Sequence, residues 1–417
     1  MNFLADIRND SLWQAFLEEK EADIYMPSSE LRRIRRIVEG KTYLRFSDWI
    51  LSREYLHTPI SKRELTVSGK DKKRVVYCYD KKRLDYQFFF KFVNMLLREF
   101  DSVFSENLYS FRSGHKIGGA VRALAKDKRH YGQYKAKLDI HDYFRSIEVD
   151  RLMPVVRKVI PDEDFLRFLE DYLSIDTFQA GNKTIVDHAG VFPGNPISGF
   201  LSNLYLSDLD AEFQDSDVTY FRYADDILIC ADREEELLQA VEKIEARMRE
   251  YGLEINPRKK EFFRPNAPYH FLGLSFTEKG VTISRETVTK IKGKIRRSAR
   301  KIRRWVERKK INPIYGVRIL VRKYNAKFFG IIPGEQSWIH WYLPYIQSDE
   351  VLREVDRYFY QEARYVMTGD HSKKGYKVLP YERLARLGHR SLVREYYVLI
   401  EARQQRRELE RASTVSS

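Results

Sequence analysis

The chain contains 417 residues, of which 43% are hydrophobic and 32% are charged. This composition excludes a disordered protein, and the length corresponds to roughly two to four ordinary domains. Its 75 lysines and arginines exceed its 60 acids, and the resulting formal net charge of +15 favours a polyanionic partner such as a nucleic acid.

The number of cysteines and the lack of long apolar runs in the sequence indicate in which cellular compartment the protein lies. Two cysteines, Cys78 and Cys230, are too few for a disulfide framework or a thiolate zinc site. No apolar run in the sequence reaches the roughly 18 residues of a membrane span, and the opening MNFLADIRND does not have the pattern of a signal peptide. We therefore expect a cytoplasmic protein without a membrane partner.

The first part of the chain predicts helices followed by a hairpin. Residues 1–60 are typical of short helices and form a basic N-terminal extension, with apolar residues at helical spacing among arginines. Those apolar residues are Leu31, Ile34, Ile37 and Val38. Two β-rich runs within residues 64–80 flank a polar turn at 68–71, which predicts a β-hairpin with a basic tip that contacts phosphates.

The middle of the chain alternates between helical and strand patterns. Residues from about 85 to 130 are typical of helices, and residues 134–140 and 218–231 are typical of strands. Between the two strand segments, the apolar residues of 198–212 lie on one face of a single predicted helix. Strands with helices on one side predict an α+β fold.

A strongly basic helix is predicted near residue 300. Residues 290–310 contain twelve lysines and arginines and one acid, Glu307. Six of the cations recur at steps of four and three and share one helix face, opposite an apolar stripe that would pack. They are Lys290, Lys294, Arg297, Lys301, Arg304 and Arg308. This face is expected to follow a nucleic-acid backbone, and a solvated basic helix is the alternative.

The sharpest local feature is a pair of adjacent acids, Asp225 and Asp226, where two apolar runs meet. The pattern predicts a strand, a turn and a second strand, with repulsion between the carboxylates that a divalent cation would relieve. Asp139 follows another apolar strand and is expected to meet them across a sheet. Three such carboxylates can hold two Mg²⁺ ions roughly 3.5 to 4 Å apart, which activates a 3′-hydroxyl and stabilises a leaving pyrophosphate. Taken alone, an Asp-Asp pair also fits a solvated turn.

Several sequence blocks follow one another in the order found in reverse transcriptases, over about residues 60 to 280. They are YSFRSG at 109–114, KLDIHDYF at 137–144, GNPIS at 194–198, YADD at 223–226, LEINP at 253–257 and FLGL at 271–274. The chain therefore resembles reverse transcriptases of the prokaryotic group that includes group II intron, retron and defence-associated enzymes. The resemblance implies a right-hand polymerase with fingers and palm in 61–284, a basic α-helical thumb in 285–403 and a polar tail in 404–417.

The resemblance also assigns catalytic roles. Asp139, Asp225 and Asp226 would be the metal ligands, with the Ile140 carbonyl as an additional ligand. The cofactor would be two Mg²⁺ ions, with Mn²⁺ as a possible substitute. Lys259 stands at the position proposed to protonate the pyrophosphate, and a solvated lysine is the alternative reading.

Further positions are implied for the nucleotide and the primer. Phe144 stands where the family places an aromatic gate against the ribose 2′-hydroxyl, which implies deoxynucleotide substrates, and an ordinary core phenylalanine is the alternative. The other expected nucleotide-binding residues are Lys73, Arg74, Arg112, Pro193 and Asn195. Pro193 departs from the family pattern, because many members carry glutamine there. The primer grip would consist of Phe271, Leu272 and Gly273.

The expected function is RNA-directed DNA polymerisation, with an RNA template, a DNA product and deoxynucleotides as partners. Residues 387–393 resemble a block of the stand-alone reverse transcriptases of bacterial anti-phage defence, whose members commonly work with a structured non-coding RNA. The alternatives are a retron-type or intron-derived enzyme, template-independent DNA synthesis and a largely non-catalytic RNA-binding scaffold. The sequence says nothing about the oligomeric state.

Overall fold

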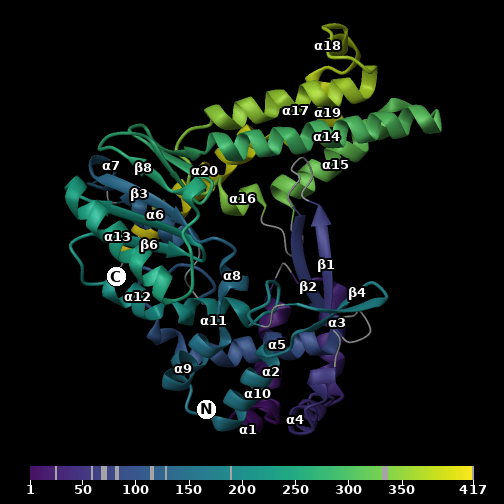
Figure 1. Cartoon of the computed structure of the whole chain (residues 1–417). Helices are drawn as coiled ribbons and strands as arrows, with labels where there is room; N and C mark the ends of the chain where they lie inside the picture. Colours follow the sequence, from purple (N-terminus) through teal and green to yellow (C-terminus); the bar gives the residue numbers. More distant parts are fainter. Residues whose placement is uncertain are drawn as a thin grey trace. The chain divides into compact units, whose positions relative to one another are not determined.

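The computed structural model of the chain describes residues 1–23, 26–57, 60–66, 73–79, 84–112, 117–126, 129–187, 190–330 and 337–415. By packing, the chain divides into two compact units (Figure 1). The first consists of Met1–Ala120 and Gly132–Pro265, and the second of Val121–Tyr131 and Asn266–Ser417. The packing boundary thus falls at Pro265, whereas the sequence placed the change between domains at 284.

The first unit begins with helices around an aromatic core. They are α1 (Phe3–Ile7), α2 (Asp10–Ala22), α3 (Ser28–Glu39), α4 (Leu44–Leu51) and α5 (Leu84–Leu96), with 3₁₀ turns at Glu54–His57 and Leu97–Val103. Trp13 of α2 stacks on Phe92 of α5 with 3.8 Å between ring centroids. Phe3 of α1 packs against Phe165, which lies far along the chain, so residues 1–60 belong to the same compact unit as the sheets below.

The predicted hairpin is confirmed within the described residues. Strand β1 (Ile60–Thr66) pairs antiparallel with β2 (Lys73–Tyr79), and the turn between them lies outside the described residues. β1 also pairs in parallel with β4 (Thr177–Ala180), which pairs antiparallel with β5 (Lys183–Val186). The resulting sheet has the strand order β2-β1-β4-β5, and the sequence had not predicted its last two strands.

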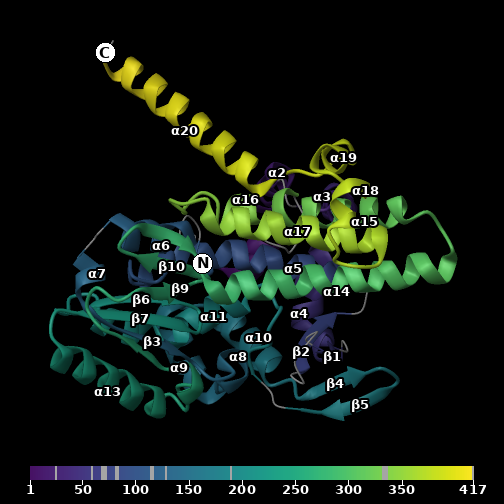
Figure 2. The ribbon, with the colours of Figure 1, turned by 90° about the horizontal axis from the view of Figure 1, so that it is seen from above.

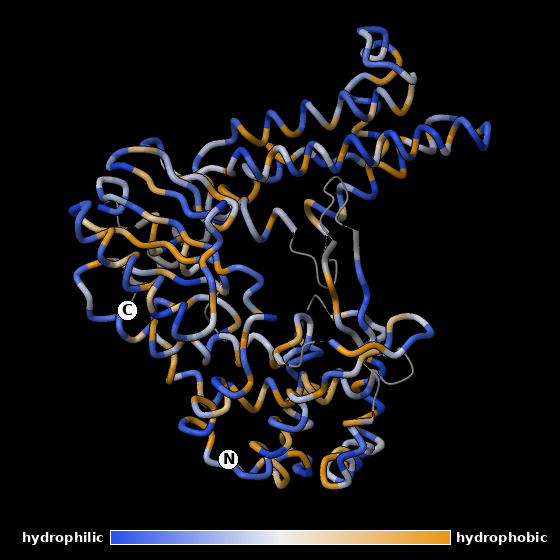
Figure 3. The backbone as a smooth tube through the Cα atoms, viewed as in Figure 1, coloured by the Kyte–Doolittle hydropathy of each residue, from blue (hydrophilic) through white to orange (hydrophobic). Residues whose placement is uncertain are grey.

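A second sheet, which we call the central sheet, has the order β6-β7-β3-β8 and is antiparallel throughout. Its strands are β3 (Tyr134–Asp139), β6 (Thr219–Tyr223), β7 (Asp226–Ala231) and β8 (Glu261–Phe263). Both strand segments predicted from the sequence are therefore confirmed: 134–140 contains β3, and 218–231 forms the predicted pair of strands, β6 and β7, joined by a turn. β7 is buried from Ile227 to the end of the strand, consistent with its hydrophobic colouring in Figure 3. On the outer side of β6, the Arg222 N–H donates to the Asn107 carbonyl, and the Arg222 carbonyl accepts from the Tyr109 N–H.

Helices surround the central sheet in the first unit. They are α8 (Tyr143–Ser146), α9 (Val149–Val159), α10 (Glu163–Leu173), α11 (Ser198–Tyr205), α12 (Ser207–Glu212) and α13 (Glu234–Glu250), with a 3₁₀ turn at Pro257–Lys259. The single helix predicted over 198–212 is wrong, because the non-helical backbone of Leu206, with φ −114° and ψ 14°, separates α11 from α12. Helix α6 (Ile117–Lys126) crosses the boundary between the units.

The second unit combines a small sheet with a helical domain. The sheet has the order β11-β10-β9, formed by β9 (Tyr269–Phe271), β10 (Leu274–Thr277) and β11 (Gly280–Ile283). The helices are α7 (Arg129–Gly132), whose last residue falls in the first unit, α14 (Arg285–Lys309), α15 (Pro313–Phe329), α16 (Trp338–Trp341), α17 (Glu350–Thr368), α18 (Lys374–Val378), α19 (Tyr381–Arg386) and α20 (Leu392–Val415).

Two long helices of the second unit, α14 and α17, run side by side (Figures 1 and 2). Glu354 of α17 forms ion pairs with Arg285 and Lys292 of α14. Figure 2 shows α20 extending away from these helices. The predicted polar tail at 404–417 is helical up to Val415, because its glutamine, arginine and glutamate residues are good helix formers. Among the described residues, none of the helices is both long and apolar enough to cross a membrane.

Candidate active site

Three acidic residues meet at one end of the central sheet. Asp139 ends β3 and Asp226 begins β7, and the two residues are direct partners in the antiparallel register. Asp225 lies in the turn before β7, and its carbonyl accepts a 3.0 Å hydrogen bond from the Ile140 N–H. The backbone thus brings together the acids and the isoleucine that the sequence predicted at separate strand ends.

The turn before Asp225 has a strained backbone. Ala224 has a φ of 57°, in the left-handed region, which costs roughly 1–2 kcal/mol for a residue with a Cβ. Its peptide groups are held by side chains. The Ala224 N–H donates to Ser110 Oγ at 2.8 Å, and Arg222 Nη1 donates to the Ala224 carbonyl at 3.3 Å.

The charge distribution of this site fits a divalent cation. Burial, and then the neighbouring charge of Asp225, raise the pKa of Asp226 to about 7. Magnesium prefers carboxylate oxygens and would stabilise the ionised form of all three acids, so the donor set fits Mg²⁺. Within the described part of the chain, no three His, Cys, Asp or Glu side chains are already arranged as a metal cluster.

Lys259 contacts the same acids from the 3₁₀ turn Pro257–Lys259. Its ammonium group donates a hydrogen bond to the Asp139 carboxylate. Burial alone would lower the pKa of Lys259, but the bond to Asp139 outweighs it, and the pKa lies above its ordinary value. The backbone fixes this placement, because the Asn256 N–H donates to the Asp139 carbonyl at 2.8 Å. Lys259 is therefore a protonated group directly beside the acidic cluster.

Phe144 lies on the short helix α8, which follows Asp139 in the chain. Its ring is half-buried and packs edge-to-face against Phe111, with centroids 6.0 Å apart. The Phe111 ring in turn lies over Gly199 of α11, where a Cβ would come within 2.6 Å of it. The sequence analysis had not singled out Phe111 or Gly199. Together they restrict the position of the Phe144 ring.

Arg112 is buried and bound by acceptors of the protein itself. Its side chain is 3% exposed and pairs with Asp101 at 3.0 Å, and its Nη1 donates to the Ser105 and Leu108 carbonyls at 2.7 and 3.2 Å. Because these acceptors engage the guanidinium group, Arg112 would have to leave them to bind the nucleotide, and its role as a nucleotide ligand stays a prediction. In the structure, Arg112 fixes the chain segment that precedes Ser110.

The remaining nucleotide-binding candidates lie on two elements. Lys73 and Arg74 belong to β2, and their side chains lie outside the described set. Pro193 and Asn195 precede α11. Asn195 donates from Nδ2 to the Tyr172 hydroxyl at 2.6 Å and accepts from the Ile197 N–H at 2.9 Å. Asn195 thus shapes the loop at the start of α11.

The predicted primer grip forms the tight turn between β9 and β10 in the second unit. Phe271 is buried, and Leu272 and Gly273 both have positive φ, of 53° and 78°. A Cβ on Gly273 would lie 2.9 Å from the Tyr342 hydroxyl and 3.1 Å from Thr287 Oγ1, so glycine is required on steric grounds as well.

The predicted basic face on α14 is also present in the second unit. All six cations of this face are exposed, whereas the buried residues of α14 include Ile291, Ile295 and Ala299 of the predicted apolar stripe. The six are Lys290, Lys294, Arg297, Lys301, Arg304 and Arg308. Lys290 pairs with Glu286 at 2.7 Å, so part of the positive charge is balanced within the helix.

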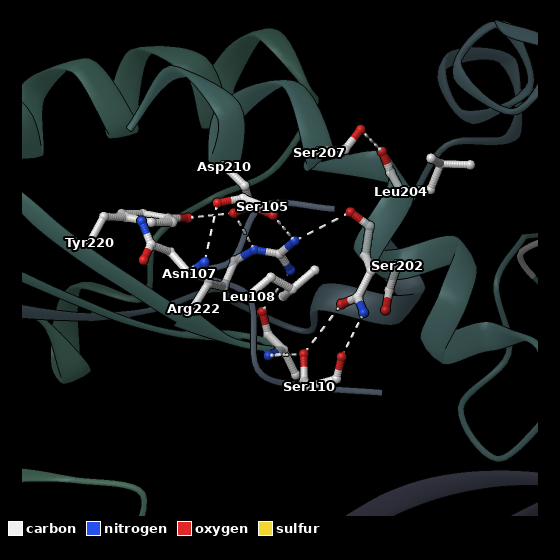
Figure 4. A network of polar contacts seen from close by, with 12 residues as sticks. Ser105, Asn107, Leu108, Ser110, Ser202, Leu204, Ser207, Asp210, Tyr220 and Arg222 are labelled. Carbon is white, nitrogen blue, oxygen red and sulfur yellow. Dashed lines mark hydrogen bonds and ion pairs between the residues drawn. The ribbon is translucent and has the colours of Figure 1, made fainter. Parts of the chain in front are cut away.

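A buried polar network lies behind the turn at Ala224 and Asp225, which we call the catalytic turn (Figure 4). It is the main feature that the sequence did not predict. Arg222 is fully buried, donates from Nε to Asp210 Oδ1 at 2.7 Å and pairs through Nη2 with the other oxygen of that carboxylate. The Tyr220 hydroxyl donates to Asp210 at 2.9 Å. The available signal was an arginine inside an apolar strand, since a buried guanidinium group requires an anionic partner.

The α+β fold, with acids at the strand ends of the central sheet, is that of a class of protein, the nucleic-acid polymerases. The sequence profile described as "Reverse transcriptase (RNA-dependent DNA polymerase)" matches residues 62–276. The chain therefore belongs to the reverse transcriptase family, and its enzyme class is RNA-directed DNA polymerase. No protein of curated function matches the sequence.

Solved structures of telomerase are similar to this chain at low identity. Apo telomerase from Candida tropicalis, truncated from its C-terminal domain, is 12% identical with a TM-score of 0.43, over 57% of this chain and 59% of that chain. Apo telomerase from the same organism is 12% identical with a TM-score of 0.44, over 84% and 71%. Telomerase from Candida albicans with a fragment of telomeric RNA is 11% identical with a TM-score of 0.42, over 86% and 70%.

Proposed function

We propose that this protein copies RNA into DNA by two-metal-ion nucleotidyl transfer at the Asp139–Asp225–Asp226 site. The observation that carries the proposal is the direct register between Asp139 and Asp226, with Asp225 hydrogen-bonded to Ile140 beside them. These three carboxylates, with the Ile140 carbonyl, would hold two Mg²⁺ ions, or Mn²⁺ in their place. The bound ions would activate the primer 3′-hydroxyl and stabilise the leaving pyrophosphate.

The residues around the acids would select and orient the substrates. The Lys259 ammonium would donate a proton to the pyrophosphate oxygen as it leaves. The Phe144 ring would exclude a ribose 2′-hydroxyl and so favour deoxynucleotides. Lys73 and Arg74 would contact the triphosphate from β2, and Pro193 and Asn195 would line the nucleotide from the loop before α11. The turn at Phe271, Leu272 and Gly273 would support the primer end.

The biological setting that we propose is bacterial anti-phage defence in the cytoplasm, with a dedicated structured non-coding RNA as template. Its support is the resemblance of residues 387–393 to stand-alone defence-associated enzymes, together with the net charge of +15. Two other readings are a retron-type or intron-derived enzyme, and an RNA-binding scaffold with little catalysis. The partially buried acids argue for the enzyme, because a scaffold gains nothing from a carboxylate whose pKa is raised to about 7.

Primer extension with purified protein tests the catalytic proposal. The wild type should incorporate deoxynucleotides on an RNA template in the presence of Mg²⁺, and Asp225→Asn should lower incorporation by at least 10³-fold through the loss of metal binding. Asp215→Asn is the matched control, because Asp215 is an exposed acid that follows α12. RNA binding without incorporation by the wild type would support the scaffold, and full incorporation by Asp225→Asn would refute the metal site.

A further inference from the structure

The polar network behind the catalytic turn joins three parts of the chain that are distant in sequence. Ser110 lies in the segment that follows the 3₁₀ turn Leu97–Val103, Asn203 lies in α11, and Arg222 lies in β6. Asn203 Nδ2 donates to the Ser110 carbonyl at 2.7 Å, and the Ser110 hydroxyl lies 3.3 Å from Asn203 Oδ1. Arg222 Nη2 also donates to the Asn203 carbonyl at 3.3 Å. Figure 4 shows Ser110, Asp210 and Arg222 of this network, which come from separate elements.

All these groups are removed from water. Ser110, Asn203, Asp210 and Arg222 each have an exposed fraction of 0%. A buried ion pair such as Arg222–Asp210 adds little stability compared with well-packed apolar residues, because both charges must first lose their hydration. Stability alone therefore does not explain why an apolar strand carries the charged residue Arg222. A role in fixing one conformation of the backbone explains it.

The network ends on the backbone of a single residue of the catalytic turn, Ala224. The Ala224 N–H and the Ala224 carbonyl are both bound, the first by Ser110 and the second by Arg222. Ala224 is the residue with the left-handed backbone, and Asp225 follows it directly. Because a left-handed alanine is disfavoured in the free chain, the two bonds select the conformation that presents Asp225 and Asp226 beside Asp139.

We propose that Ser110 and the Arg222–Asp210 pair are positioning residues that hold the two peptide groups on either side of the Ala224 Cα and thereby set the geometry of the Asp225 and Asp226 carboxylates for metal binding. This inference rests on the proposed function of the aspartates as metal ligands. It adds residues that touch neither substrate nor metal. Their effect is exerted through the backbone of the turn.

The experiment compares three variants in the full chain. Ser110→Ala removes the acceptor of the Ala224 N–H, and Arg222→Lys keeps a cation against Asp210 but loses the second arm that reaches the Ala224 carbonyl. Ser47→Ala is the matched control. Ser47 is 1% exposed, and its hydroxyl also makes two hydrogen bonds, to the Leu44 carbonyl and from Arg8, on helix α4.

Metal binding is read directly by titration of the protein with Mn²⁺ followed by electron paramagnetic resonance, next to the Mg²⁺ dependence of incorporation. Ser110→Ala and Arg222→Lys should weaken Mn²⁺ binding about three- to tenfold and raise the half-saturating Mg²⁺ concentration by the same factor, with RNA affinity unchanged. Excess Mg²⁺ should restore part of the rate. Ser47→Ala should lower the unfolding temperature without changing metal affinity.

The outcomes separate this proposal from the one on which it rests. If both variants bind Mn²⁺ as tightly as the wild type while unfolding at a lower temperature, the network is only part of the core and the positioning proposal is overturned. If Asp225→Asn also retains Mn²⁺ binding and incorporation, the error lies in the proposed metal site. Loss of Mn²⁺ binding in Asp225→Asn with no change in Ser110→Ala would refute the positioning role alone.

Discussion

Lys259 donates a hydrogen bond to the carboxylate of Asp139, the residue that faces Asp226 across β3 and β7. The ammonium group therefore balances part of the negative charge of the acidic cluster when no metal is bound. A cation that binds Asp139 has to compete with Lys259 or displace it. Lys259 thus opposes metal binding at Asp139, and its ammonium group is also close enough to donate a proton at the same site.

Replacement of Lys259 by glutamine separates these two effects. Lys259→Gln should lower the single-turnover rate about 10²-fold if the ammonium is the proton donor, because a general acid contributes about 10² to 10⁴. The same variant should bind Mn²⁺ at least as tightly as the wild type. Lys260→Gln is the control, since Lys260 pairs with Glu245 at 2.6 Å. An unchanged rate in Lys259→Gln would leave this lysine with a purely electrostatic role.

Metal binding should depend on pH through Asp226. Its pKa is raised from 3.8 to about 7 by burial and by Asp225, so below pH 7 the free carboxyl holds a proton that the metal must displace. The apparent affinity for Mg²⁺ should fall about tenfold for each pH unit below 7 and become constant above it. Thermal unfolding with and without Mg²⁺ between pH 5 and 8 measures this dependence.

The same pKa predicts the stability of the metal-free protein. Protonation of Asp226 stabilises the folded state at low pH, and this contribution is lost as the pH rises through about 7. Asp226→Asn removes the charge and should flatten that part of the profile. A wild-type profile identical to that of Asp226→Asn between pH 5 and 8 would contradict the raised pKa.

Phe144 should determine the choice of sugar. Phe144→Ala should raise ribonucleotide incorporation relative to deoxynucleotide incorporation by at least tenfold, because the ring is the bulk that would reject the 2′-hydroxyl. Phe144→Tyr keeps the ring and should preserve the selectivity. Competition between ribo- and deoxynucleotides in primer extension gives the ratio. An active Phe144→Ala with wild-type selectivity would make Phe144 an ordinary core residue.

The basic face of α14 should dominate salt-dependent binding. Replacing Arg297, Lys301 and Arg304 by glutamine should weaken binding of RNA and primer-template of any sequence, and reduce the slope of log affinity against log salt by about two to three units. The control is a triple variant in which three exposed cations from separate elements are replaced by glutamine. They are Lys158, Arg249 and Lys279. Equal slopes for the two triple variants would show that only net charge matters.

Much of the acidic site follows from local sequence patterns. Apolar runs that end abruptly at acids are enough to place Asp139, Asp225 and Asp226 at strand ends, because a short apolar run bounded by a turn is typical of a buried strand. The hairpin β1–β2 and the helix α14 are predictable for the same reason. Each of these elements carries its own apolar face in consecutive residues.

The partners of buried polar groups were not predictable in this way. Arg112 has the side-chain chemistry of a phosphate ligand, yet it is buried against Asp101, which lies 11 residues earlier in the 3₁₀ turn Leu97–Val103, and no local pattern marks this pairing. Likewise, no local pattern joins Arg222 of β6 to Asp210 of α12. Sequence periodicity had also predicted one continuous helix over 198–212, although the helix is broken at Leu206. Strands β4 and β5 are four residues each, too short to show a period.

The contact of Asn107 and Tyr109 with Arg222 has a consequence for how the protein behaves at high concentration. β6 is an edge strand of the central sheet, and an exposed edge offers unpaired peptide groups to strands of other molecules. Here the segment that contains Asn107 and Tyr109 occupies both backbone groups of Arg222, the fourth of the 5 residues of β6. The opposite edge, β8, has only three residues. The sheet that carries the acids therefore offers little backbone for intermolecular strand addition, which protects apolar stretches such as β7 from Ile227 onward against aggregation.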